Sequence, residues 1–110
     1  MQLKRVVVTG LGALTPLGNT VEEYWNGLIN GVSGASAIIK FDASKHKTRF
    51  ACEVKNFSVD DYIDRKEARK MDPFSHYAVV AADQAIVDAG LDTDQTINKE
   101  KIGVIFGSGI

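Results

Sequence analysis

The sequence predicts an α/β fold, and three features carry that prediction. Residues 4–9 contain three successive valines, a continuous β-branched run typical of a strand buried on both faces. Residues 102–106 form a second apolar stretch of strand length. Between them, apolar residues recur at helical spacing in two stretches that begin after Thr20 and Asp72. Strands that alternate with helices indicate a sheet covered by helices.

A glycine-containing loop follows the first predicted strand. A dinucleotide-binding G-x-G-x-x-G loop would start at Gly10 and Gly12 but would need a third glycine where Thr15 stands. Pro16 and most of a loop also separate these glycines from the next helix, so its N-terminus would lie far from a pyrophosphate. We therefore assign the glycines to turn geometry and expect no nucleotide or other cofactor.

The first helix is predicted to begin at Thr20. Glu23 stands three residues later and completes a capping-box pattern, and Gly31 is expected to end the helix. Its apolar face comprises Val21, Tyr24, Trp25, Leu28 and Ile29.

An alternating stretch follows at residues 49–55. Phe50, Cys52 and Val54 alternate with polar or small residues, which predicts a half-buried strand with these three side chains facing the core. Cys52, the only thiol, is therefore expected to be a small core residue and not a nucleophile.

A long helix is predicted within residues 72–90. Asp72 can cap it, Pro73 fits its first position, and Gly90 fits its end. Most residues of its apolar stripe are alanine, so another backbone can approach it closely. The stripe comprises Phe74, Ala78, Ala81, Ala82, Ala85, Ile86 and Ala89.

A basic turn precedes this helix, with Asp64 expected to cap it. Arg65 and Arg69 lie four residues apart, as do Lys66 and Lys70, which predicts two adjacent rows of positive charge. Charge pattern alone leaves two interpretations open: a solvated helix face, or a patch that attracts an acidic partner.

Composition excludes several classes of protein. A formal net charge of −1 argues against a general nucleic-acid binder, although nine of the thirteen lysines and arginines fall between Lys40 and Lys70. No apolar run reaches the roughly 20 residues that span a bilayer, and no signal-peptide pattern opens the chain. A single cysteine forms no internal disulfide. These observations predict a cytoplasmic protein.

Other titratable residues predict no chemistry. His46 lies in a basic loop and His76 on the expected surface of the long helix, and neither has a second ligand at metal-binding spacing. The acidic cluster Asp60, Asp61 and Asp64 is explained by helix capping. No metal site and no nucleophile–base pair is predicted.

Two strands and two helices leave sheet edges and helix faces uncovered. We therefore expect residues 1–110 to be the opening segment of a larger α/β domain, interrupted at a strand and turn.

Several motifs, in order along the whole chain, resemble the β-ketoacyl-acyl carrier protein synthases, most closely the elongating synthase II type. The motifs are Val6-Val7-Val8-Thr9-Gly10-Leu11-Gly12, Thr15-Pro16-Leu17-Gly18-Asn19-Thr20, Arg65-Lys66-Glu67, Arg69-Lys70-Met71-Asp72, Ile102-Gly103 and Gly107-Ser108-Gly109-Ile110.

The resemblance implies the N-terminal part of a thiolase-like α/β/α fold, incomplete in this chain, in an enzyme that is usually a homodimer. It implies a decarboxylative Claisen condensation between an acyl group and malonyl-acyl carrier protein in fatty acid elongation. The family's catalytic cysteine and two histidines belong to motifs further along. Cys52 does not match the nucleophile motif, so no catalytic residue is expected here and the fragment alone should be inactive.

Two site roles follow from the resemblance. Lys66, Arg69 and Lys70 match the patch that docks the acidic carrier protein, with Arg65 adjacent, and Ile110 matches an apolar residue of the acyl pocket near the dimer interface. The alternative is a non-catalytic fragment, or a relative similar to chain-length factors, that has only a carrier-protein-binding or structural role. Chain-length factors lack the cysteine and would look alike over these residues.

Overall fold

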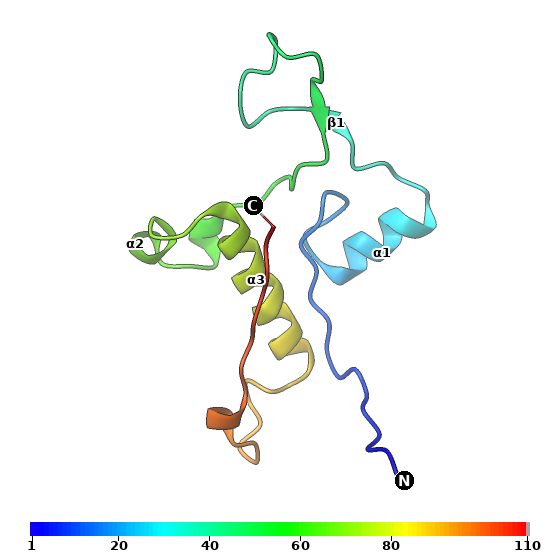
Figure 1. Ribbon diagram of the computed structural model, residues 1–110, viewed down its shortest axis with the longest axis vertical. Helices are drawn as coiled ribbons and strands as arrows, with labels where there is room; N and C mark the ends of the chain where they lie inside the picture. Colours follow the sequence, from blue (N-terminus) through cyan, green and yellow to red (C-terminus); the bar gives the residue numbers. More distant parts are fainter. Residues whose placement is uncertain (110) are drawn as a thin grey trace.

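The computed structural model describes residues 1–109, and Ile110 lies outside the described residues. Its regular elements alternate with long connections (Figure 1). In chain order they are α1 (Val21–Ile29), β1 (Ser36–Ala37), β2 (Phe50–Ala51), the 3₁₀ turn η1 (Val59–Asp61), α2 (Arg65–Ala68), α3 (Pro73–Asp88) and the 3₁₀ turn η2 (Lys99–Lys101). None of the helices found in this range is long and apolar enough to span a membrane.

The two predicted apolar strands are not hydrogen-bonded strands within residues 1–109, so that part of the prediction is wrong. Thr9, at the end of the first stretch, and Val104 and Phe106, in the second, instead line one hollow together with Gly10, Gly12 and α3. A strand requires a neighbouring backbone that completes its ladder of hydrogen bonds. Neither stretch has one here, and Val6 and Ile105 are 88% and 97% exposed.

The alanine stripe of α3 packs against the glycine-containing loop. A Cβ atom added at Gly10 would lie 2.3 Å from the carbonyl oxygen of Ala85, and one added at Gly12 would lie 2.0 Å from that of Ala81. Close approach of another backbone is therefore confirmed. The prediction that turn geometry explains Gly10 and Gly12 is wrong, because neither has a positive φ and both lie against the backbone of α3.

Polar side chains of α3 fix the same loop. The backbone N–H of Leu11 donates to Oδ2 of Asp88 at 2.9 Å, and that of Ala13 donates to Oε1 of Gln84 at 3.0 Å. Nε2 of Gln84 in turn donates to the carbonyl of Asn19 at 2.8 Å. Because backbone groups of an irregular loop need partners, these bonds hold the loop on the helix.

Helix α1 begins and ends as predicted, but its apolar face is not covered. The Thr20 hydroxyl accepts from the N–H of Glu23, whereas the Glu23 carboxylate reaches Asn19 and not Thr20. Gly31 adopts φ +64° just beyond the helix, where a left-handed residue closes the last turn. Among the apolar residues Trp25 is 61% exposed, since no other described element packs on that side.

The alternating stretch faces the opposite way from the prediction. β2 pairs antiparallel with β1, and the buried residue beyond it is Glu53, whose carboxylate accepts from the N–H groups of Ile39 and Lys40 at 3.0 and 3.2 Å. Phe50 and Cys52 are exposed. The inward carboxylate satisfies backbone donors that would otherwise be buried without partners, and this decides which face turns inward.

The described residues bury little apolar surface. The radius of gyration is 17.3 Å, whereas a compact domain of this length has one of about 13 Å. The buried hydrophobic residues are Ala43, Ala68 and Val80. The expectation that these elements leave faces uncovered is confirmed.

Candidate functional site

The entrance of α3 carries the basic turn, residues 64–70, which contains α2. The Asp64 carboxylate accepts from the N–H groups of Lys66 and Glu67 at 2.9 and 3.4 Å, as the predicted cap requires. Helical geometry ends after one turn, and the N–H of Lys70 bonds to the carbonyl of Glu67 at 3.0 Å. The prediction of a short capped turn is confirmed.

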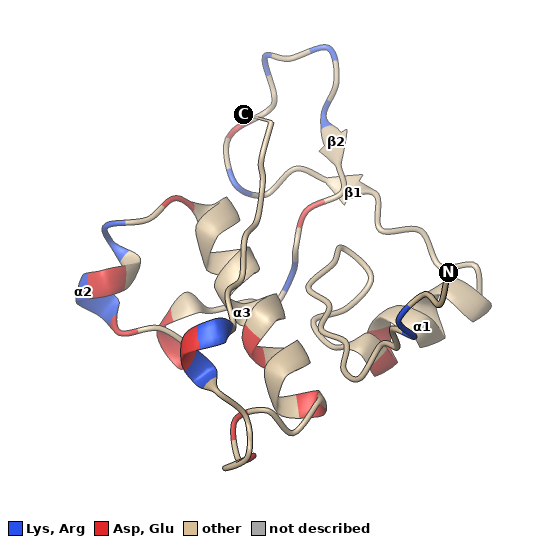
Figure 2. Cartoon of the chain, turned by 60° about the horizontal axis from the view of Figure 1, so that its bottom comes forward, with Lys and Arg blue, Asp and Glu red and all other residues tan. Residues whose placement is uncertain are grey.

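Lys and Arg make up four of the seven residues of this turn, and Figure 2 shows their positions along α2 and the segment that follows it. Lys70 pairs with Glu67 at 2.8 Å, and both side chains are well exposed, so this pair contributes little to stability. Within residues 1–109 it is the one ion pair with a nitrogen–oxygen distance of 4.0 Å or less. The exposed Lys66 and Arg69 therefore project charges that no carboxylate in the described chain offsets at that distance.

The inner side of the turn is attached to α3. Ala68 is 5% exposed, and its carbonyl lies 2.8 Å from Nε2 of His76, in the first turns of α3. A carbonyl only accepts, so Nε2 carries the hydrogen. His76 is half-buried and bonded, which corrects the expectation of a solvated helix-surface residue. The sequence did hold a signal, since a histidine one turn inside a helix can reach back to the preceding segment.

Other candidate residues lie apart from this site. His46 is exposed, with its ring edge-to-face against Phe41 at 5.7 Å between centroids. Cys52 is exposed beside β2. In the part of the chain described, no group of three or more His, Cys, Asp or Glu residues is arranged to hold a metal ion.

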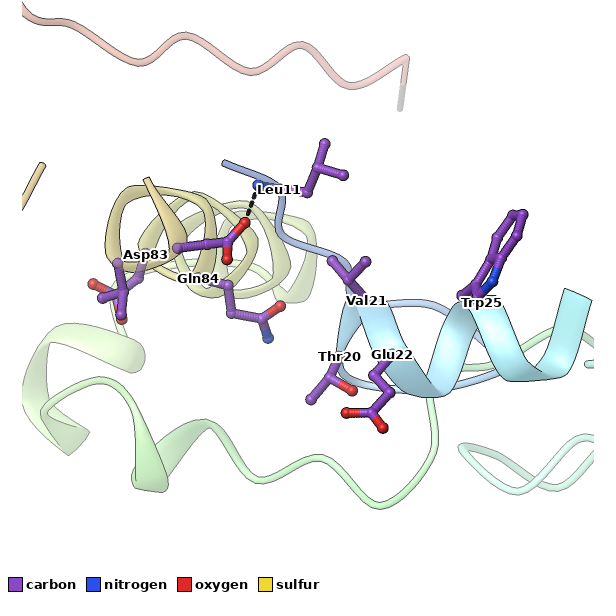
Figure 3. A pocket seen from close by; sticks show the side chains of 9 residues that line it. Leu11, Thr20, Val21, Glu22, Trp25, Asp83 and Gln84 are labelled. Atoms are coloured by element: carbon purple, nitrogen blue, oxygen red, sulfur yellow. Dashed lines mark hydrogen bonds between the residues drawn. The ribbon is translucent and has the colours of Figure 1, made fainter. Parts of the chain in front are cut away.

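An open cleft of about 660 Å³ lies between the start of α1 and the second half of α3 (Figure 3). Its walls include Val21 and Trp25 from α1 and Asp83 and Gln84 from α3, and Leu11 contributes from the loop. Gln84 and Asp88 already bond to the glycine-containing loop, so these two polar side chains of the cleft serve the fold. The sequence analysis did not predict this cleft, because it depends on how two helices lie in space.

A second, mainly apolar hollow of about 320 Å³ lies at the start of α3. Leu14, Phe74 and Phe106 line it together with Gly107 and Ser108, which come shortly before Ile110 in the sequence.

Comparison with known proteins gives a consistent result. The family described as "Beta-ketoacyl synthase, N-terminal domain" matches residues 3–110. The 3-oxoacyl-(acyl-carrier-protein) synthase 2 of Synechocystis sp. is 52% identical over 110 residues, which are 100% of this chain and 26% of the relative. The enzyme of the same name from Staphylococcus aureus strain COL is 48% identical over 109 residues, 99% of this chain and 26% of the relative. The chain thus spans about a quarter of their length.

Two solved structures share the fold. The ishigamide ketosynthase/chain length factor superposes with a TM-score of 0.71 at 36% identity, over 88% of this chain and 23% of that one. A beta-ketoacyl synthase from Burkholderia phymatum gives 0.67 at 33% identity, over 86% and 24%. The predicted fold class, the N-terminal part of a thiolase-like α/β/α fold, is confirmed.

Proposed function

Because this chain belongs to the beta-ketoacyl synthase family, we propose that it acts within an elongating condensing enzyme of fatty acid synthesis. The observation that carries the proposal is the 52% identity to a synthase 2 along the whole chain. In the proposed reaction, an enzyme cysteine thiolate attacks the acyl-carrier protein thioester, which forms an acyl-enzyme thioester and releases the phosphopantetheine thiol of the carrier. Malonyl-carrier protein then loses CO₂, and the resulting carbanion attacks the acyl-enzyme thioester. The product is a 3-oxoacyl-carrier protein two carbons longer, and the cysteine thiolate is released.

Residues 1–110 form the N-terminal segment of the synthase domain in this proposal, and they supply no reacting group. Cys52 lies exposed beside a short hairpin and has no role in the reaction. The nucleophile and its two histidines come from other parts of the enzyme. Substrate and malonyl donor both arrive on acyl carrier protein, and the enzyme is a cytoplasmic homodimer.

Incubation of the intact protein with acyl- and malonyl-carrier protein tests the reaction. Mass spectrometry should detect a 3-oxoacyl-carrier protein two carbons longer, together with released CO₂. A chain-length-factor-like relative is the second candidate, favoured by the similarity to the ishigamide ketosynthase/chain length factor. Such a relative would give no product. We rank it second because the identity to that structure is 36%, compared with 52% to the synthase 2 of Synechocystis sp..

Lys66, Arg69 and Lys70 form the proposed docking site for acyl carrier protein. All three side chains are exposed, they lie within one turn, and Lys66 and Arg69 are not neutralised by a neighbouring carboxylate among residues 1–109. Opposite charges steer association and speed the encounter, and salt screens them. Such a site suits a strongly acidic partner.

Charge reversal tests this site. K66E/R69E/K70E in the intact protein should weaken binding of the carrier protein about tenfold or more at low salt and reduce the salt dependence. The control is K45E/K47E/K101E, which changes the net charge equally at exposed positions elsewhere. Equal dissociation constants for the two variants, measured by calorimetry, would contradict the docking assignment.

Ile110 is proposed to line the acyl pocket. Its support is the family resemblance and the apolar hollow of which Gly107 and Ser108 form one wall. Ile110→Trp in the intact enzyme should shorten the longest acyl chain that is accepted, because the larger ring would occupy pocket volume. An unchanged chain-length profile would contradict this role.

A further inference from the structure

We propose that His76 is a positioning residue that holds the basic turn in its docking orientation on α3; this inference rests on the proposed docking function. No other side chain in the described part of the chain forms a hydrogen bond from α3 to the backbone of the basic turn.

The turn needs such a support because it is too short to be stable alone. α2 has four residues, fewer than an isolated helix requires by a wide margin. Its cap, Asp64, is local and orders only the first backbone N–H groups. The last carbonyl groups of a helix have no partner inside it. Here the Ala68 carbonyl accepts from the N–H of Met71 at 3.2 Å and from Nε2 of His76 at 2.8 Å.

The His76 bond closes a loop that contains two of the three proposed docking residues, Arg69 and Lys70. Their backbone is therefore fixed against the first turns of α3, where the carbonyl of Asp72 accepts from the N–H groups of Ser75 and His76. Ala68 is buried at 5% exposure, so water replaces a lost imidazole partner poorly.

A turn that is already ordered loses less conformational entropy when the carrier protein binds. Residues ordered before the encounter lose less conformational freedom on binding, and the charges of Arg69 and Lys70 stay at a fixed spacing. His76 touches neither the carrier protein nor the reacting groups in this proposal. It acts through the backbone of the turn.

The test compares three variants of the intact enzyme. His76→Leu removes the donor, His76→Gln keeps an N–H donor at similar reach, and His46→Leu is the control, a histidine whose ring forms no hydrogen bond in the described structure. We expect His76→Leu to raise KM for the acyl-carrier protein about three- to tenfold with kcat little changed. His76→Gln should restore KM to within about twofold, and His46→Leu should leave it unchanged.

Hydrogen exchange on the same variants separates this inference from the docking assignment. His76→Leu should speed exchange in peptides covering residues 64–71, and His76→Gln should not. Faster exchange without a change in KM would refute the positioning role while the basic turn could still dock, as K66E/R69E/K70E would show. If the charge reversal also leaves binding unchanged, the docking function itself fails. Unchanged exchange in His76→Leu overturns the inference whatever the charge reversal shows.

Discussion

The two ends of α3 differ in what they contact. At its C-terminal half, the helix backbone lies against Gly10 and Gly12, and Gln84 and Asp88 hold the loop that contains them. At its N-terminal end, the helix follows the basic turn, whose charged residues are exposed. Close packing tolerates little change in volume, whereas an exposed charge can be replaced with little effect on folding. One end should therefore govern stability, and the other should govern binding.

The largest effect on stability is expected from Gly12→Ala. Replacing glycine by alanine usually gains about 0.4–1 kcal/mol through the unfolded chain. Here the added Cβ would lie 2.0 Å from the Ala81 carbonyl oxygen, a backbone atom that cannot rotate away. Overpacking of this kind costs about 3 kcal/mol, so it exceeds the gain. Urea denaturation of the intact protein should show the loss.

Gly103→Ala is the matched control. Its φ is not positive and no atom lies within 4 Å of the added Cβ, so stability should be equal or slightly higher. Equal stabilities of the two alanine variants would show that α3 does not pack against the loop as described.

Gln84→Leu should have the next largest effect. It leaves the N–H of Ala13 and the carbonyl of Asn19 without their partner, at a cost of about 2 kcal/mol. Asp83→Asn, at the adjacent exposed position, has no such bond to lose and serves as the control. Carrier-protein affinity should be the same in both variants. A fall in affinity with Gln84→Leu would break the division between the two ends.

Glu67→Gln tests whether the Lys70–Glu67 ion pair limits binding at the N-terminal end of α3. It releases Lys70 from its 2.8 Å ion pair and should raise carrier-protein affinity about twofold at low salt, with no measurable change in stability. Calorimetric titration at two salt concentrations measures this. Weaker binding would mean that Glu67 itself contacts the partner.

The smallest effect is expected beyond the packed end, at Asp94. The hydroxyl and the backbone N–H of Thr96 donate to its carboxylate and lower the pKa of Asp94 below 3.8. A lowered folded pKa stabilises the protein above the unfolded value, and this contribution disappears as the pH falls through the folded pKa. Asp94→Asn should therefore have a slightly lower Tm than the unchanged protein at neutral pH. At pH well below 3.8 the two Tm values should be equal. A difference that persists at low pH would contradict this cause.

Local signals in the sequence predicted the helices well. Thr20, Pro73 and Gly90 mark real helix ends, because caps depend on the few residues around them. Asp72 stands at the N-cap position of α3, but its side chain forms no capping hydrogen bond, so that part of the prediction is wrong. The alanine stripe also predicted close backbone packing, since small side chains leave space for it. The stripe does not indicate which backbone packs on it, so the sequence alone does not link Gly10 and Gly12 to α3.

Features that depend on distant neighbours were less predictable. The alternation at residues 49–55 predicts two faces, and hydropathy predicts that Cys52 lies on the buried one. In the structure Cys52 is exposed, and Glu53 is buried because its carboxylate accepts from the backbone N–H groups of residues 39 and 40. The valines of residues 4–9 predict a strand, but a strand also requires a neighbouring backbone to pair with. No segment within residues 1–109 pairs with this stretch. The basic turn was predicted from charge spacing, and its attachment through His76 required the structure.

Hydrogen exchange of the intact protein with and without acyl carrier protein tests the central claim most directly. If the basic turn docks the carrier protein, exchange should slow in peptides that cover residues 64–72 and stay unchanged in those covering residues 81–89, which pack on the glycine-containing loop. Protection at residues 81–89, or none at residues 64–72 under saturating carrier protein, would contradict the account.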